Sequence, residues 1–248
     1  MTSTKVSIIT AIYNAEQYLD QALQSICNQS YKNIEIIVID GGSTDRSMSI
    51  VDKFSHNIDV KVSEKDNGIY DAWNKGVALA TGDVIGFCNG DDYLAVDAIE
   101  KALSVIDLGV PSLVYGDVQL LDEITGHSYF EAGSFLPAML YRGFGFRTTT
   151  VFFNRMALDV NGAFNESYRI AGDSDWLLRA YGNNVLFLYG ANLTYMRLGG
   201  VSNLYEAAAF MEYCMALYKH SLFGYKSLFV LLKKYIKKFV RKASETAG

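Results

Sequence analysis

The sequence predicts an α/β fold with a mostly parallel central sheet, flanking helices and a C-terminal helical extension. Continuous Ile/Val-rich runs occur at residues 6–10, 34–39 and 84–88, and segments with helical spacing separate them. Such runs are typical of strands covered on both faces, as in a parallel sheet with helices on each side. With 248 residues and 50% hydrophobic content, the chain can bury one large core that carries an appendage.

The elements are expected in the following order along the chain. Strands are predicted at residues 6–10, 34–39, 60–62, 84–88, 113–121, 127–135, 148–154, 185–188 and 193–197. Helices are predicted at residues 15–28, from residue 44, and at 69–80, 96–106, 155–160, 174–181 and from 204 onward. In the first helix, apolar side chains recur every three or four residues. We expect residues 1–203 to form one α/β domain and residues 204–248 a helical, basic and amphipathic extension.

Charge and cysteine usage exclude some classes of protein. Residues 219–242 carry eight of the 22 basic residues and no acid, so 14 basic residues face 27 acidic ones in the rest of the chain. A nucleic-acid-binding body would need a basic face, and we therefore expect no nucleic-acid partner. Three scattered cysteines without metal-ligand spacing favour free thiols in a reducing compartment.

The sequence offers no targeting or membrane-spanning segment. The first strand follows directly on residues 1–5, which leaves no room for a signal peptide. No uninterrupted apolar stretch is long enough for a transmembrane helix. We therefore expect a cytoplasmic protein.

Polar residues stand at the ends of three predicted strands. Thr10 and Asp40 end the first two, and Asp91 and Asp92 follow the strand at 84–88. In an open parallel sheet, ligands bind in the crevice beyond these strand ends. Paired carboxylates suit a hard divalent cation that also binds substrate phosphates, although an acid such as Asp92 is also favoured at a helix start. Because three strands end in the same way, the pattern favours a binding site.

The segment that precedes the helix at 69–80 adds a second candidate. Asp66-Asn67-Gly68 is a turn signal. The helix that follows it offers free N–H groups and a positive dipole end to an anion. Lys75 is then either a phosphate contact or a solvated lysine.

Taken together, these motifs resemble the family-2 inverting glycosyltransferases, whose nucleotide-sugar-binding fold is called GT-A. The resemblance spans roughly residues 5–203. Within the family, the sequence most resembles bacterial enzymes that build O-antigen and other surface polysaccharides. It rests on an ordered set of motifs at residues 10–14, 39–45, 66–76, 89–92, 162–166, 172–179 and 198–202.

The resemblance implies a role for each matching position. Asp40 would accept a hydrogen bond from a uracil ring, and Asp91 and Asp92 would hold Mn²⁺ or Mg²⁺. Asp173 would be the catalytic base, with Asp175 as the alternative because Gly172 replaces the usual glutamate before the base. The nucleotide sugar would contact Thr10, Ala11, Tyr13, Asn14, Asp40, Asp66, Asn67, Gly68, Lys75, Asn89 and Asp91.

Besides Gly172, further differences from the family and its relatives shape the expected activity. Asn89 replaces the first acid of the usual Asp-x-Asp, which predicts weaker metal binding. Thr148-Thr149-Thr150 stands where relatives often carry a histidine, so the acceptor side is expected to differ. The Gln-x-x-Arg-Trp motif of processive relatives is absent, so one sugar per event is expected.

The resulting prediction is a metal-dependent, inverting hexosyl- or N-acetylhexosaminyltransferase. Its donor would be a nucleotide-diphosphate sugar, with a UDP-sugar favoured, and its acceptor a hydroxyl of a lipid-linked glycan. A nucleotidyltransferase would need a glycine-rich basic loop where this chain has residues 11–14. A non-catalytic nucleotide-sugar-binding protein is expected to have lost some of Asp40, Asp92 and Asp173, and all three are present.

The C-terminal segment allows two interpretations. Between residues 223 and 242, aromatic and aliphatic residues recur at spacings of three and four, and lysines and arginine crowd the other faces. Such a helix either packs on the domain with a solvated basic side, or lies on an anionic membrane surface. Because a lipid-linked acceptor is expected, the second interpretation predicts peripheral contact with the inner face of the cytoplasmic membrane through residues 223–242.

Overall fold

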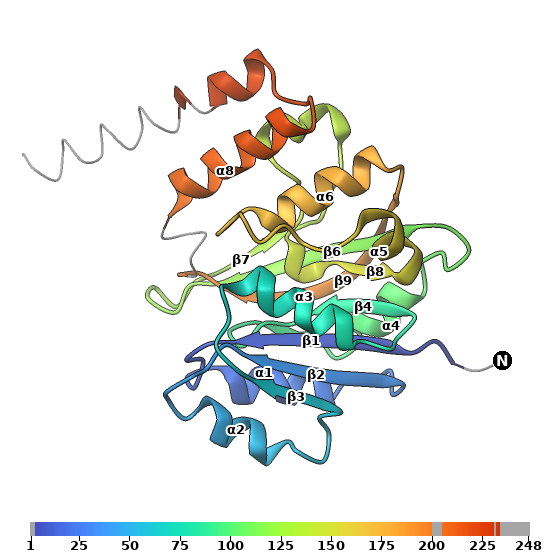
Figure 1. Ribbon diagram of the computed structural model, residues 1–248, viewed down its shortest axis with the longest axis vertical. Helices are drawn as coiled ribbons and strands as arrows, with labels where there is room; N and C mark the ends of the chain where they lie inside the picture. Colours follow the sequence, from blue (N-terminus) through green and yellow to red (C-terminus); the bar gives the residue numbers. More distant parts are fainter. Residues whose placement is uncertain (1–2, 200–204, 231, 234–248) are drawn as a thin grey trace, which may run out of the picture.

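The computed structural model describes residues 3–199, 205–230 and 232–233, and these form a curled sheet with helices on both faces (Figure 1). The strands are β1 Val6–Ile12, β2 Ile34–Asp40, β3 Val60–Ser63, β4 Val84–Phe87, β5 Tyr93–Leu94, β6 Ser112–Leu121, β7 Ser128–Glu131, β8 Phe152–Asn154 and β9 Leu186–Arg197. The helices are α1 Leu19–Cys27, α2 Ser47–Lys53, α3 Ile69–Leu79, α4 Ala98–Leu103, α5 Arg155–Asn161, α6 Gly172–Gly182 and α8 Glu206–Lys219, with 3-10 turns η1 Pro137–Arg142 and η2 Thr148–Thr150.

The sheet has the strand order β3-β2-β1-β4-β8-β6-β9-β5, and β7 pairs with β6. The pairings β3–β2, β2–β1 and β1–β4 are parallel, as the Ile/Val runs predict. Beyond β4 the sheet is mixed, because β8 pairs antiparallel with both β4 and β6. The described chain between β6 and β8 contains only β7 and 3-10 turns, so β8 returns without the helical crossover that a parallel pairing needs.

Several predicted boundaries differ from the observed ones. The segment at 148–154 begins as the turn η2, and only Phe152–Asn154 is a strand. The strands expected at 185–188 and 193–197 are one continuous strand, β9, whose register with β6 shifts between Tyr115 and Asp117. The two-residue strand β5 lacks any apolar periodicity and was not predicted. The first helix, predicted from residue 15, begins at Leu19, and the residues before Leu19 form a loop.

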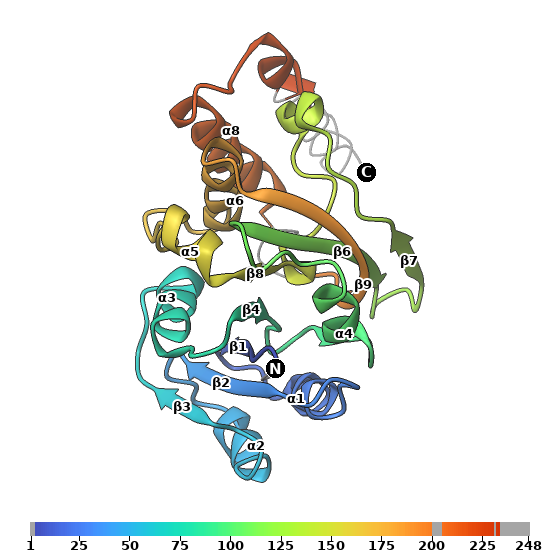
Figure 2. The ribbon, with the colours of Figure 1, turned by 90° about the vertical axis from the view of Figure 1, so that its right-hand side faces the viewer.

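Two apolar clusters lie on opposite faces of the sheet (Figure 2). One includes the buried sides of α1, α2 and α4, and the periodicity predicted for the first helix is confirmed by the burial of Leu19, Leu23 and Ile26. The other includes α3, α6 and α8. All three cysteines are free, as predicted.

Helix α8 is packed on α6, at the opposite end of the molecule from α2 (Figures 1 and 2). Its residues Phe210, Tyr213 and Leu217 are buried in the same cluster as α6. The predicted boundary between residues 203 and 204 lies outside the described residues. The first helix of the predicted extension therefore shares a core with the α/β domain. Within the described ranges, no helix has the length and apolar character needed to cross a membrane.

Candidate active site

The loops that follow β1 and β2 are joined to each other by hydrogen bonds. The Asn14 N–H donates to Ser43 Oγ at 2.8 Å, and Asn14 Oδ1 accepts from the Thr44 N–H at 2.9 Å. Asn14 has a φ of 49°, a left-handed conformation that asparagine tolerates better than most residues. Beside it the Tyr13 side chain is 65% exposed. These hydrogen bonds therefore hold the two loops together, and the Tyr13 side chain beside them is exposed to solvent.

The polar residues Thr10, near the end of β1, and Asp40, at the end of β2, are closed to solvent. Asp40 is buried, and its carboxylate accepts from the Ser43 N–H at 3.0 Å and from Ser63 Oγ at 2.6 Å. Thr10 and Ala11 are also buried, and Thr10 Oγ1 has no hydrogen-bond partner. The Asp40 carboxylate has further lone pairs besides those that accept the hydrogen bonds from Ser43 and Ser63. The predicted contact between Asp40 and a uracil ring stays a prediction, because its carboxylate is closed to solvent in this structure.

Asp66 lies directly against the turn that follows β2. A Cβ atom on Gly41 would stand 2.4 Å from Asp66 Oδ2, so a larger residue there would require the Asp66 carboxylate to move. Asp66 Oδ1 accepts from the Gly68 N–H at 3.0 Å, and Asn67 donates its N–H to Asp71 Oδ2 at 2.9 Å. The structure thus brings the predicted residues at 66–68 to the end of β2, at the start of α3.

Lys75 has partners within the chain. Its Nζ lies 2.8 Å from Glu64 Oε1 and 3.4 Å from Asp71 Oδ2. The hydrogen bond with Glu64 raises the pKa of Lys75. A bound phosphate would therefore compete with two carboxylates for this ammonium group.

The loop after β4 carries one exposed and one buried carboxylate. Asp91 is exposed, whereas Asp92 is only 3% exposed. Burial raises the pKa of Asp92 well above its usual range, and the negative charge of Asp91 adds to this effect. Arg197, from the end of β9, donates to the Asp91 carbonyl oxygen at 2.6 Å and stacks over Tyr18 at 3.9 Å.

These two carboxylates fit a cation that the substrate helps to coordinate. In the described part of the chain, no group of three or more His, Cys, Asp or Glu could hold a metal by itself. Mg²⁺ is commonly bound by one or two carboxylates with substrate phosphates and water. A divalent charge would also offset the cost of a buried carboxylate beside a second acid. Asp91 and Asp92 therefore fit Mn²⁺ or Mg²⁺ bound together with a diphosphate.

Asp173 lies in the first turn of α6 and is only partly buried. Thr148 Oγ1 donates to Asp173 Oδ2 at 2.7 Å, and the Ser174 N–H donates to Oδ1 at 2.7 Å. Burial raises the pKa of Asp173, and the hydrogen bond from Thr148 opposes that rise. The preceding Gly172 packs on the Tyr70 ring, which a Cβ atom would meet at 2.8 Å. This contact gives a physical reason for glycine where the family pattern has glutamate.

Asp175 has different surroundings. It is fully buried, with His220 Nε2 at 3.0 Å, Arg179 Nε at 3.3 Å and Lys219 Nζ at 3.9 Å. Two of these partners come from the end of α8 or the residue after it. Asp175 therefore joins α8 to α6, while Asp173 is less deeply buried.

Helix α3 connects Asp173 with the loop after β4. The Tyr70 hydroxyl lies 3.4 Å from Asp173 Oδ1, and the Tyr70 and Trp73 rings meet edge to face at 5.5 Å. Trp73 Nε1 in turn donates to Asn89 Oδ1 at 3.2 Å. No functional role is predicted for Tyr70 or Trp73 from the sequence, because aromatic residues at helical spacing also indicate simple packing.

Comparisons with known proteins identify the family of this chain. The family described as glycosyl transferase family 2 matches residues 7–158, more than half of the chain. A PGL/p-HBAD biosynthesis glycosyltransferase of Mycobacterium tuberculosis is 29% identical over 246 residues, which cover 96% of this chain and 93% of the relative. The glycosyltransferase GlyG of Streptococcus pneumoniae is 34% identical over 131 residues, or 52% of this chain and 44% of GlyG.

Solved structures show the same fold. The mannosyltransferase PcManGT of Pyrobaculum calidifontis, in complex with GDP-Man and Mn²⁺, has a TM-score of 0.67 at 18% identity, over 89% of this chain and 65% of that one. S. aureus TarS has a TM-score of 0.65 at 22% identity, over 86% of this chain but only 39% of TarS. The predicted GT-A fold is confirmed. The chain belongs to glycosyl transferase family 2.

Proposed function

We propose that this glycosyltransferase moves one sugar, with inversion, from a nucleotide-diphosphate sugar to a hydroxyl of a glycan acceptor. The observation that carries the proposal is the line of contacts from Asp173 through α3 to the loop after β4. An inverting displacement needs a base on the acceptor side of the anomeric carbon and stabilisation of the leaving group on the other side. Asp173 supplies the first, and Asp91 and Asp92 serve the second.

Asp173 is the better candidate for the base. Asp173 is less deeply buried than Asp175, and Thr148 holds its carboxylate. Its raised pKa brings it closer to the operating pH that suits a general base. Asp175 is buried among three basic side chains, where it cannot reach an acceptor without breaking the junction between α6 and α8. A general base at this position contributes about 10²–10⁴-fold to the rate.

The donor side is assigned to the loops after the parallel strands. Asp91 and Asp92 would hold Mn²⁺ or Mg²⁺, which offsets the negative charge of the departing nucleoside diphosphate. The start of α3 adds N–H groups suited to a phosphate. A UDP-sugar is the donor that we expect, and TarS has been solved with UDP-GlcNAc. The remaining donor contacts are assigned to Thr10, Ala11, Tyr13, Asn14, Asp40, Asp66, Asn67, Gly68, Lys75 and Asn89.

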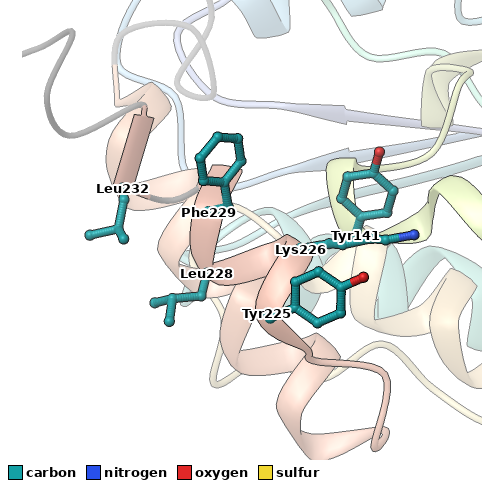
Figure 3. A pocket seen from close by; sticks show the side chains of 6 residues that line it. All are labelled: Tyr141, Tyr225, Lys226, Leu228, Phe229 and Leu232. Atoms are coloured by element: carbon teal, nitrogen blue, oxygen red, sulfur yellow. The ribbon is translucent and has the colours of Figure 1, made fainter.

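The acceptor is proposed to be lipid-linked, at the inner face of the cytoplasmic membrane, in the synthesis of a bacterial surface polysaccharide. Of the segment 223–242, residues 231 and 234–242 lie outside the described residues. In the described part, Phe223 and Val230 pack against the core, whereas other apolar side chains are exposed. These exposed side chains line a pocket, which Figure 3 shows. Its lining residues are Tyr141, Tyr225, Lys226, Leu228, Phe229 and Leu232.

Both interpretations of this segment therefore have support: a helix packed on the domain, and a helix that lies on an anionic membrane surface. One side of the described chain contacts the core, and the other combines exposed rings and aliphatic groups with lysines. That combination suits the headgroup boundary of an anionic bilayer, where each lysine adds about 1 kcal/mol.

The proposed activity can be tested with a panel of UDP-GlcNAc, UDP-glucose, UDP-galactose and GDP-mannose in the presence of Mn²⁺. Release of the nucleoside diphosphate is the expected result. A nucleotidyltransferase would consume or release pyrophosphate instead, and a non-catalytic protein would bind a nucleotide sugar without releasing diphosphate.

Two variants separate the roles of the acidic residues. Asp173→Asn should retain calorimetric binding of UDP with Mn²⁺ and lose turnover by at least about 10²-fold, because a base acts only in the chemical step. Asp92→Asn should lose the Mn²⁺-dependent part of UDP binding. If Asp173→Asn stays active while Asp175→Asn is inactive, the base is Asp175.

A further inference from the structure

Helix α6 begins without a capping side chain of its own. Its N-cap residue, Ala171, makes no side-chain capping bond. The N–H groups at a helix start need partners from elsewhere. Here the N–H groups of Arg169, Ile170 and Ala171 all donate to the carboxylate of Glu212 on α8, at 3.2, 2.8 and 2.9 Å. One side chain from the C-terminal helix therefore caps the segment that leads into α6.

The same segment is held on its other side by α3. The Tyr70 hydroxyl donates to the Ile170 carbonyl oxygen at 2.6 Å and lies 3.4 Å from Asp173 Oδ1. Residues 169–171 are thus fixed through their N–H groups by Glu212 and through a carbonyl by Tyr70. Asp173 follows two residues later on the same backbone.

We propose that Glu212 is a positioning residue for Asp173, an inference that rests on the proposed role of Asp173 as the base. A carboxylate suits this position because its hydrogen bonds to N–H groups are charge-assisted and because negative charge is favoured at a helix start. Without it, three donors lose their partner and the backbone before Asp173 is free to shift. A displacement of about 1 Å at a catalytic group can lower the rate about 10²-fold.

Glu212 differs from the other contacts that hold α8 in place. The Tyr213 hydroxyl donates to the Leu140 carbonyl oxygen at 2.6 Å, and His220 contacts Asp175 at 3.0 Å. Neither contact touches the backbone at 169–171. Tyr213→Phe is therefore a matched control, since it removes a buried anchor from the same helix and leaves the Glu212 cap intact.

The test compares Glu212→Ala, Glu212→Gln and Tyr213→Phe in the full-length protein, with the panel nucleotide sugar that the wild type turns over fastest. We expect Glu212→Ala to lower kcat about 10- to 100-fold, with unchanged calorimetric binding of UDP and Mn²⁺ and a displaced pH profile of kcat. Glu212→Gln keeps one acceptor oxygen of the same reach and should recover part of the rate. Tyr213→Phe should keep the wild-type pH profile.

A measurement without substrate accompanies these rates. Amide hydrogen exchange at residues 169–173 should become faster in Glu212→Ala and stay unchanged in Tyr213→Phe. Equal exchange at these amides, or equal kcat and pH profiles in the two variants, would overturn the positioning role. Asp173→Asn run in parallel separates the two proposals. If that variant is fully active, the base assignment fails. If it is inactive while Glu212→Ala resembles Tyr213→Phe, only the positioning role fails.

Discussion

The contact between Gly172 and Tyr70 predicts that Gly172→Ala destabilises this enzyme. In an ordinary helix, replacing glycine by alanine gains up to about 1 kcal/mol. At Gly172 the new Cβ atom would stand 2.8–2.9 Å from three atoms of the Tyr70 ring. That ring is 4% exposed, it stacks on Phe164, and its hydroxyl is bonded to Ile170. It cannot move aside without losing these contacts.

The expected cost follows from the balance of the two effects. Overpacking a filled site costs about 1–3 kcal/mol, which exceeds the gain in helix propensity. We expect a net loss of about 1–2 kcal/mol, and a lowering of Tm by about 2–8 °C in a chain of this size. Turnover should fall as well, because the displaced Tyr70 also contacts Asp173.

Thermal unfolding followed by circular dichroism measures this effect, with Gly182→Ala as the control. Gly182 ends the same helix, and a Cβ atom there would meet nothing within 4 Å. That variant should be as stable as the wild type or slightly more stable. If Gly172→Ala had a Tm equal to or above that of Gly182→Ala, the explanation given for glycine at this position would be refuted.

Three further predictions concern the base, the fold and the C-terminal segment. Thr148→Val removes the hydrogen bond that lowers the pKa of Asp173. The acidic limb of the profile of kcat/KM against pH should therefore move to higher pH, and an unmoved limb would contradict this prediction. Burial acts to raise the pKa of Glu35, but hydrogen bonds from neighbouring lysine, serine and threonine residues outweigh it and hold the pKa at about 2. This carboxylate should therefore add about 2–3 kcal/mol of stability at neutral pH, which is lost as the pH falls from about 4.5 to 2; urea unfolding of Glu35→Gln should lack that pH dependence. Deletion of residues 223–248 should leave UDP binding intact and abolish sedimentation with anionic vesicles, whereas equal vesicle binding by both proteins would count against the membrane role.

The donor half of the fold could be predicted from the sequence because its signals are local. Each Ile/Val run forms one parallel strand. The predicted polar residues lie close to the strand ends, with Thr10 just before the end of β1, Asp40 at the end of β2, and Asp91 and Asp92 in the loop after β4. In a parallel sheet these ends share one edge, so the convergence of the loops after β1, β2 and β4 follows from the pattern. The mixed half gives weaker signals. Strand β8 has three residues and β5 has two, too few for a period of two to be recognised.

The contacts that support Asp173 could not be predicted from the sequence. Thr148 and Glu212 stand 25 residues before and 39 residues after Asp173, and neither belongs to a motif with known spacing. Glu212 lies on an amphipathic helix, where an acidic residue normally indicates a solvated face. Only the packing of α8 on α6 turns that carboxylate toward the backbone at 169–171.

The two halves of the sheet divide the proposed reaction between them. The parallel strands carry the loops assigned to the nucleotide and the metal, whereas the mixed half and α8 supply Thr148, Asp173 and Glu212. The family match ends at residue 158, so it includes the donor loops but not Asp173 or the helix that caps its segment. Among the contacts between the halves, those of α3 join the two proposed sites, because its Tyr70 reaches Asp173 and its Trp73 reaches Asn89. Arg197 on β9 also contacts Asp91. Substitutions on the second half that spare both α3 and Arg197 should therefore alter the acceptor step with little effect on donor binding.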